Sequence, residues 1–441
     1  MRLKAYTKFA LSIAITLFIA QAALASNNPK TLAVQAVSDN ATESAKAISE
    51  LREMGQAGLD ALFDVYGAEI KALANESAGS QTDALQRISN ALDLVSQQRN
   101  SYASRLFWYT DFEKAKAAAR VSGKPILSLR LLGNLNEEFS CANSRFFRTV
   151  LYANKTVADV LRERFILHWK SVRPAPRVTI DYGDGRKLER TLTGNSIHYI
   201  LAPDGGVIDA MPGLYGPQAF LRGLNQAETI YKLSAGQNES ERAAFLNRYH
   251  TGRVAEIGKQ WAADAAKVGV KIPESIERDE ASGKSFDARV AARTAMSKMV
   301  SEIGIINAIS YDVALLKGAT DEVAWAKIAG LHTEDARLDR DSIALVRRQN
   351  SSEKGFAIND EQLSRIVANF ERYLAFDTVR NEFTMHATLH AWLSTGLRRE
   401  DVDTFNERVY KEVFMTPNSD PWLGLYSPDT YTALENGGLS K

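Results

Sequence analysis

Cysteine is almost absent from this sequence of 441 residues, which contains only Cys141. A single thiol cannot form a disulfide within the chain, so the class of small secreted domains that are stapled by disulfides is excluded. The folded chain must therefore be stabilised by packing, and its one thiol needs an explanation of its own.

The sequence also lacks a charge excess and long apolar runs. Its 54 basic and 53 acidic side chains leave a formal net charge of +1, which gives no electrostatic reason to expect nucleic acid or an anionic membrane as partner. The most apolar stretch, residues 9–20, is shorter than the roughly 20 residues that a membrane-spanning helix needs. Glycine-rich phosphate loops and a Gly-x-Ser-x-Gly elbow are missing, and no cofactor is predicted.

The N-terminus has the parts of a secretory signal peptide. Three basic side chains in the first eight residues precede the apolar stretch, and Ala23 and Ala25 supply the small residues that signal peptidase accepts. We therefore predict that residues 1–25 are cleaved and that the mature chain begins near Ser26. A periplasmic or secreted protein without a membrane span is expected.

The following segment, residues 26–104, is predicted to be a helical region. Residues 26–45 are rich in Asn, Ser and Thr and are typical of a loose leader. From Ala47 onward, apolar residues recur every three or four positions, which is the spacing of amphipathic helices. Gly55 and Gly58 separate two such runs and indicate a helical hairpin.

The pattern changes at Arg105, where strand signals begin to alternate with helices. Residues 105–232 are predicted to form one α/β unit. Its expected elements are a helix capped by Thr110 or Asp111, a strand at 126–132, a helical stretch at 144–164, a strand at 165–172, hairpins at 178–192 and 197–210, and a helix starting at Pro217.

Residues 233–441 carry almost no strand signal and are predicted to form a helical C-terminal domain. Because a single core stops growing at about 250–300 residues, a chain of this length is expected to have several domains. Helices are predicted around 240–266, 286–303, 305–317, 321–330, 360–375, 379–395 and 400–413.

Over residues 106–230 the order of these elements resembles that of the thioredoxin-like superfamily. The segments TDFEKAKAAARVSGKPILSL and VADVLRERFILHWKSV are similar to that family. The combination of SCANSRFFRTVLYAN, TIDYGDGRKLERTLTGNSIHY and SDPWLGL resembles a group of uncharacterised exported bacterial proteins, which brings no known activity with it. The resemblance implies an α/β thioredoxin-like central domain with mainly α-helical N-terminal and C-terminal regions.

In that family a Cys-x-x-Cys-Lys/Arg motif follows the first core strand. Here Cys141 matches the first cysteine, Ser144 replaces the second, and Arg145 matches the trailing base. The family's cis-proline, which faces the active-site sulfur, falls near Ser196 or His198, and neither is proline. The resemblance therefore argues against dithiol oxidoreductase activity and leaves monothiol exchange, isomerisation or redox sensing.

The chemistry expected of Cys141 depends on its position at the start of a helix. Backbone N–H groups and the helix dipole favour the thiolate there. Arg145 and Arg148 act in the same direction, whereas Glu137 and Glu138 oppose it. Such a thiol could form a mixed disulfide with another protein or a small thiol. The alternative is an inert, buried cysteine in a thioredoxin-fold scaffold for protein interaction.

His198 is a candidate partner of this thiol. It belongs to a predicted strand near the cis-proline position, so it could approach Cys141 and activate it. The alternative is a strand histidine that is satisfied by a backbone carbonyl.

A second candidate site contains His386 and His390. With Glu382 they recur every four residues on one face of a predicted helix, and two such histidines can share a metal ion. A third ligand is needed, and Glu382 lies two turns from His390. Ala387 stands where the His-Glu-x-x-His motif of zinc peptidases has glutamate. A metal-dependent enzyme is one interpretation; a pair of histidines packed near Trp392 is the other.

Overall fold

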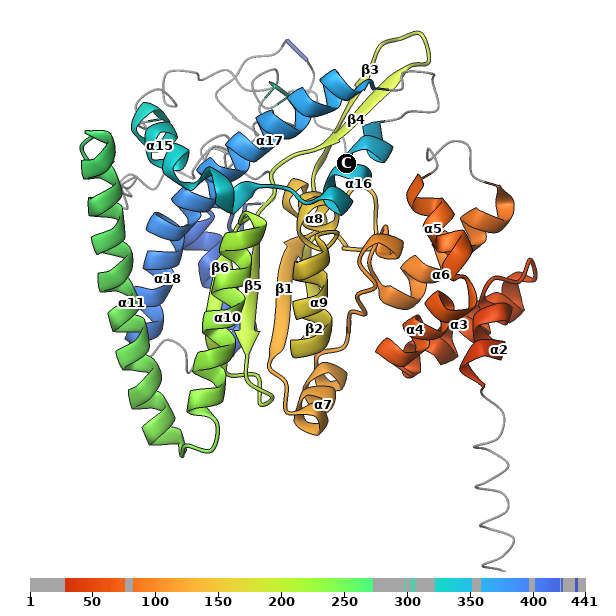
Figure 1. Cartoon of the computed structure of the whole chain (residues 1–441), viewed down its shortest axis with the longest axis horizontal. Coiled ribbons are helices and arrows are strands. Elements are labelled where there is room, and N and C mark those ends of the chain that lie inside the picture. Colours follow the sequence, from red (N-terminus) through yellow and green to blue (C-terminus); the bar gives the residue numbers. More distant parts are fainter. Residues whose placement is uncertain are drawn as a thin grey trace, which may run out of the picture.

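The computed structural model describes residues 28–75, 82–272, 322–350, 358–395 and 401–420, together with the isolated residues 298, 302, 304, 305, 422, 433 and 434. A four-stranded sheet stands at its centre, with the N-terminal helices beyond one end and long C-terminal helices beyond the other (Figure 1). The predicted signal peptide lies outside the described residues. Within the described ranges, none of the helices combines the length and the apolar composition needed to cross a membrane.

The central sheet has the strand order β2-β1-β5-β6. β1 runs parallel to β2 and antiparallel to β5, and β5 pairs antiparallel with β6. Every residue of β1 is buried, as expected for an apolar strand that is covered on both faces. The predicted strands are confirmed as β1 (Ile126–Leu132), β2 (Ile166–Arg173), β5 (Ser196–Leu201) and β6 (Val207–Pro212).

The other predicted hairpin forms a separate two-stranded sheet. β3 (Arg177–Asp181) pairs antiparallel with β4 (Lys187–Thr191). Gly183 and Gly185 in the turn have φ of 76° and 88°, which glycine adopts without the strain that a side chain would add. The hairpin extends away from the central sheet (Figure 1).

The helices next to the sheet begin where the sequence indicates. Asp111 accepts hydrogen bonds from the N–H groups of Glu113 and Lys114, and Gly123 ends the same helix in the left-handed region. Proline occupies the first position of the last helix of the unit. These helices are α7 (Phe112–Ser122) and α10 (Pro217–Ser234).

The helical stretch predicted over residues 144–164 is not continuous. α8 (Ala142–Phe146) passes into a π-helical segment (Phe147–Leu151), and α9 begins only after Asn154. The Asn154 side chain caps α9 by accepting a hydrogen bond from the Val157 N–H. The apolar spacing continues across this break, so periodicity alone does not detect it. α9 covers Lys155–Arg164.

The N-terminal region is helical from Pro29, so the prediction of a loose leader over residues 26–45 is wrong. Asn28 accepts a hydrogen bond from the Lys30 N–H, and proline fits the first helical position. Leu32 is buried against the neighbouring helices, which stabilises a segment whose composition looks polar. The helices are α2 (Pro29–Ala36), α3 (Ala41–Glu53), α4 (Gln56–Val65), α5 (Gly67–Asn75) and α6 (Asp83–Ser96).

The described C-terminal part is helical, as predicted. The helices expected at 286–303 and 305–317 lie, apart from a few isolated residues, outside the described residues. The described helices are α11 (Glu239–Val268), α15 (Glu322–Ala329), α16 (Arg340–Asn350), α17 (Asp360–Arg380), α18 (Ala387–Ser394) and α19 (Val402–Arg408). Asn381–His386 and Val409–Val413 are π-helical, and Gly330–Ala336 is a 3-10 segment.

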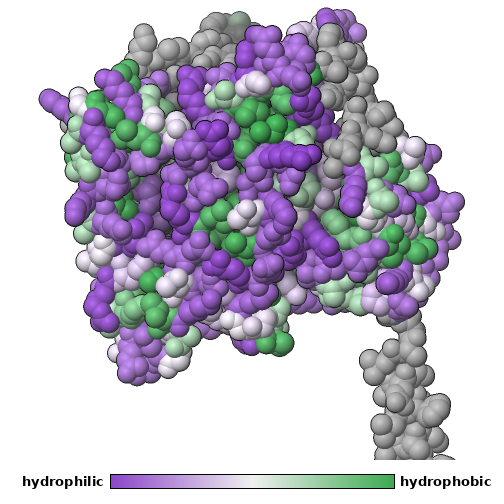
Figure 2. Space-filling view, viewed as in Figure 1, coloured by the Kyte–Doolittle hydropathy of each residue, from purple (hydrophilic) through white to green (hydrophobic). Residues whose placement is uncertain are grey.

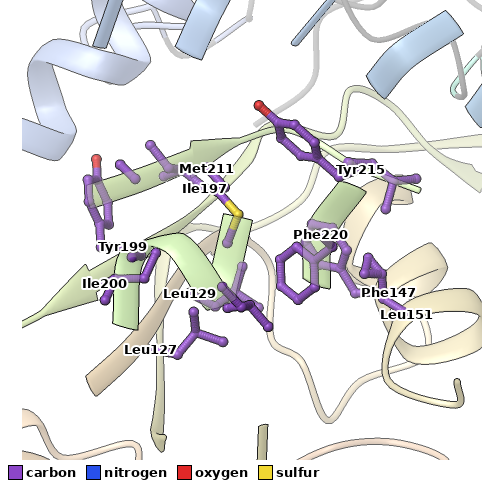
Figure 3. Packing of buried hydrophobic residues seen from close by; sticks show 14 of the residues in the cluster. Leu127, Leu129, Phe147, Leu151, Ile197, Tyr199, Ile200, Met211, Tyr215 and Phe220 are labelled. Atoms are coloured by element: carbon purple, nitrogen blue, oxygen red, sulfur yellow. The ribbon is translucent and has the colours of Figure 1, made fainter. Parts of the chain in front are cut away.

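One hydrophobic core joins the central sheet to the C-terminal helices. Phe147 and Leu151 lie beside Phe220 of α10 (Figure 3), and Tyr199 of β5 packs against Phe405 of α19. The boundary predicted between the central and C-terminal domains therefore crosses a shared core. The physical reason is that a sheet with two apolar faces needs helices from both parts to cover it.

A second core lies beneath the N-terminal helices. Ala153 and Leu345 belong to it, so the central unit and α16 both pack against this region. On the face shown in Figure 2, hydrophilic residues predominate and hydrophobic residues form separate patches. The apolar side chains are thus concentrated in two interior clusters.

Candidate functional site

The structure places Cys141 at the start of a helix directly after β1, as the sequence indicates. Cys141 is the N-cap residue of α8, and its backbone N–H donates to the Leu132 carbonyl at 3.1 Å. Its exposed fraction is 0%. A thiol must reach a partner disulfide to exchange with it, so this burial opposes the exchange chemistry that the helix start would favour.

Ser144 and Arg145, which align with the last two positions of the Cys-x-x-Cys-Lys/Arg motif, make hydrogen bonds that stabilise the local structure. The Ser144 hydroxyl donates to the Cys141 carbonyl at 2.8 Å, and that carbonyl also accepts the Arg145 N–H at 3.1 Å. Arg145 donates from Nη2 to the Thr191 hydroxyl at 2.8 Å and thereby ties α8 to β4. None of these contacts involves the sulfur atom.

The segment that packs against the start of α8 precedes the positions predicted for the cis-proline. A Cβ on Gly194 would lie 3.0 Å from the Asn143 backbone nitrogen. The neighbouring Asn195 side chain accepts a hydrogen bond from the buried Lys298 ammonium at 2.8 Å. Ser196 is the next residue in the chain, and its hydroxyl accepts a hydrogen bond from the Asn143 side-chain amide at 3.0 Å. Lys298 of the C-terminal part thus contacts the segment that packs against the start of α8, next to Cys141.

His198 is held by aromatic neighbours. Its Nε2 lies 2.7 Å from the Tyr152 hydroxyl, and its ring packs against Phe147 and Phe220. Burial lowers the pKa of His198 to about 3, so the ring is neutral at physiological pH. Among the described residues no hydrogen bond joins it to Cys141, and its geometry is that of a packed strand histidine.

His386 and His390 lie on one helical face, as predicted, with ring centroids 4.2 Å apart. Two residues from other elements complete a cluster around them. His250 of α11 approaches His390, with 2.8 Å between their Nδ1 atoms. Asp209 of β6 brings Oδ1 to within 3.5 Å of His386 Nε2 and 3.9 Å of His390 Nδ1.

Asp209, His250 and His390 form a candidate metal centre. One ligand atom from each residue lies within 4.8 Å of the other two, and all three side chains are buried. Two imidazoles and one carboxylate are a donor set that suits Zn²⁺ and Fe²⁺. Glu382 and His386 are not members of this set of three, although His386 lies next to it.

The Asp209 carboxylate is oriented from both sides. Its Oδ2 accepts a hydrogen bond from the Tyr249 hydroxyl at 2.6 Å, and its Oδ1 accepts one from the Ala210 N–H at 2.8 Å. The nearby histidines hold the pKa of Asp209 well below its usual range, although burial opposes this. The Tyr249 hydroxyl and the Ala210 N–H thus give this carboxylate the outer hydrogen-bond support that metal ligands need.

The two helix histidines, His386 and His390, differ in protonation state because their pKa values are shifted in opposite directions. Burial lowers the pKa of His390 well below its usual value, and His386 acts in the same direction. For His386 burial opposes the charge, yet the carboxylates of Glu382 and Asp209 raise its pKa to about 9. His390 is therefore neutral, which is the form that binds metal, and His386 is protonated beside it.

A cavity of about 510 Å³ adjoins this cluster. His386 and Glu382 line it, and their side chains are joined by a contact of 2.7 Å between Nδ1 and Oε2. Arg253 also lines the cavity and donates to Glu382 at 2.9 Å. A small molecule in the cavity would meet a histidine–carboxylate pair with the candidate metal centre directly behind it.

Sequence reasoning identified two members of the cluster and missed Asp209, His250 and Tyr249. The available signal was the rarity of histidine, because three of the six in the chain meet here. No protein family, no curated protein and no solved structure gives a significant match to the chain.

Proposed function

We propose that the protein is a metal-dependent enzyme for a small molecule, with a divalent transition metal ion bound by Asp209, His250 and His390. The observation that carries this proposal is the convergence of three buried ligands from β6, α11 and α18 behind a cavity. Burying a carboxylate and two imidazoles is costly unless they are paired or bind an ion. Three protein ligands also leave a position for water or substrate, as in catalytic zinc sites.

The side chains on the cavity wall support chemistry next to this centre. His386 carries a proton between two carboxylates, and its contact with Glu382 fixes the ring. A histidine in that position could donate a proton to a bound molecule or hold it in place. The role of the metal would be to polarise the molecule or a water, and the role of His386 would be acid–base transfer.

The central α/β unit is proposed to be a thioredoxin-like scaffold. The order of its elements from α7 to α10 and the sheet order β2-β1-β5-β6 support this. In the proposal Cys141 is a structural thiol rather than an exchange site, because its side chain is buried. Export to the periplasm or the medium remains part of the proposal and depends on the leader sequence.

Metal analysis of the purified mature chain tests the proposal. After dialysis against Zn²⁺ or, anaerobically, Fe²⁺, elemental analysis is expected to give one bound ion per chain, and titration calorimetry a saturable site. His390→Ala and Asp209→Asn are expected to lose that ion. His332→Gln is the matched control, because His332 lines the same cavity but pairs with Asp264. Absence of bound metal in the wild type, or equal binding in His390→Ala, would overturn the proposal.

A further inference from the structure

A second cleft, of about 550 Å³, lies between α6, the helical turns after Cys141, α16 and α17. It shares no lining residue with the cavity beside His386. Four arginines line it, whereas Asp93 and Glu138 are its only acidic residues. The lining arginines are Arg99, Arg145, Arg148 and Arg348.

Arg148 is the most unusual of these side chains. Its exposed fraction is 2%, and in the described part of the chain it has no carboxylate within ion-pair distance. Its Nη2 makes two long contacts of 3.4 Å, to the Glu138 carbonyl and the Ser140 hydroxyl, and its Nε and Nη1 have no hydrogen-bond partner there. Burial lowers its pKa to about 10, so the guanidinium stays charged at neutral pH. A buried cation with no carboxylate within ion-pair distance and with two unused nitrogen donors is unfavourable unless something binds it.

Two more guanidinium groups at the cleft have unused donors. Nε of Arg145, and Nε and Nη1 of Arg348, are buried without partners among the described residues. The Arg348 guanidinium also lies over the Tyr102 ring, 4.6 Å from its centroid, which holds it in place. Three guanidinium groups around one cleft therefore point to an anionic ligand.

The acidic residues of the cleft do not satisfy these donors. Glu138 pairs with Arg99. The Asp93 carboxylate accepts hydrogen bonds from the N–H groups of Asn100 and Ser101 at 3.1 and 2.9 Å, so its oxygens are turned toward the segment that follows α6. Glu302, which does not line the cleft, is a further carboxylate whose charge acts on Arg145. Within the cleft lining, positive charge thus remains in excess at Arg145, Arg148 and Arg348.

The cleft also has an apolar wall. Phe146 and Phe370 line it with ring centroids 4.8 Å apart. An inorganic anion would use the guanidinium groups alone, whereas an organic one could also cover these rings.

We propose that this cleft binds a small organic phosphate monoester, with the phosphate held by Arg145, Arg148 and Arg348 and the organic part against Phe146 and Phe370. Guanidinium groups are strong donors to phosphate oxygens, and each of these three has at least one N–H donor without a partner among the described residues. This binding function does not depend on the metal centre, because the two sites have no residue in common.

Titration calorimetry on the full mature chain, with phenyl phosphate and inorganic phosphate as probes at constant ionic strength, tests the proposal. The wild type is expected to bind phenyl phosphate saturably and more tightly than inorganic phosphate. Arg148→Met is expected to weaken both at least tenfold. Arg365→Met is the matched control, because Arg365 is an exposed arginine of α17 that pairs with Glu361, and it should bind as the wild type does.

Thermal unfolding separates a binding role of Arg148 from a structural one. Without phosphate, Arg148→Met is expected to be at least as stable as the wild type, because a buried charge that lacks a carboxylate partner is removed. If that variant does not fold, Arg348→Met, which changes a less buried arginine, is expected to weaken the binding of both phosphate probes at least tenfold. No saturable binding by the wild type, or unchanged affinity in the folded variants, would overturn the proposal.

Discussion

The Nδ1 atoms of His250 and His390 lie 2.8 Å apart, although 140 residues separate them in the chain. The contact joins α11 to α18, which pack side by side beyond the edge of the central sheet (Figure 1). Asp209 adds a ligand from edge strand β6. A metal ion at this point would connect three elements that are otherwise held together by packing and by hydrogen bonds such as that from Tyr249 to Asp209.

Removal of the metal is therefore expected to lower the thermal stability of the protein. An ion present at 100 times its dissociation constant stabilises the native state by about 2.7 kcal/mol. We expect the wild type to lose several degrees in Tm on addition of a chelator, as measured by differential scanning fluorimetry. His250→Ala should begin at the lower Tm and show no further loss, and an equal loss in this variant would contradict the assignment.

The thiol of Cys141 is expected to be unreactive in the folded protein. Its burial leaves no path for a reagent, whereas unfolding exposes it. Labelling with iodoacetamide, followed by mass spectrometry, should be slow in buffer and complete in urea. Cys141→Ser provides the blank. Rapid labelling of the native protein would instead restore monothiol exchange as the leading hypothesis.

Because Gly194 packs closely against the start of α8, replacing it with alanine is expected to lower the free energy of unfolding. In Gly194→Ala the new Cβ would lie 3.0 Å from Asn143 N and 3.1 Å from Ala142 Cβ, so the start of α8 would have to move by a few tenths of an ångström. We expect a loss of about 1–3 kcal/mol in the free energy of unfolding, measured in urea.

Gly252 supplies the control for that measurement. It lies inside α11 with open space around its Cα. Gly252→Ala is therefore expected to stabilise the protein by up to about 1 kcal/mol. Equal effects at both positions would show that Gly194 is not confined.

The charge on His386 predicts how the free energy of unfolding of the metal-free protein, prepared with a chelator, depends on pH. Its folded pKa of about 9 lies above the value of about 6.5 expected for an unfolded histidine. The protonated ring therefore stabilises the fold fully below pH of about 6.5, and this contribution is lost as the pH rises toward 9. The free energy of unfolding should fall across this window in the wild type. His386→Gln should show a flatter profile, and an unchanged slope would contradict the ion pair.

Local signals in the sequence predict the central unit well. The apolar run of β1 is recovered with its bounds, and the Asp111 cap and Gly123 stop of α7 follow from residue chemistry that acts within a few positions. The start of α8 at Cys141 is likewise local. The first helix is missed because its stability comes from the burial of Leu32 against distant helices.

The candidate site, in contrast, depends on contacts between distant segments, which the sequence does not reveal. The spacing of His386 and His390 is visible in the sequence, whereas Asp209 and His250 reach them only through the packing of β6 and α11. Without those partners the helix pair lacks a third ligand, which is why the sequence alone leaves a metal site at His386 and His390 as one of two interpretations. Burial of the Cys141 side chain is also a property of the tertiary structure, since residues from the C-terminal part cover that end of the sheet.

The most direct test of the metal centre is anomalous diffraction from a crystal of the mature protein soaked in Zn²⁺, with data collected on both sides of the zinc absorption edge. The proposed metal centre predicts a peak bounded by Asp209, His250 and His390, about 2.0–2.2 Å from a ligand atom of each. A zinc-soaked crystal with no anomalous peak among these three side chains would contradict it.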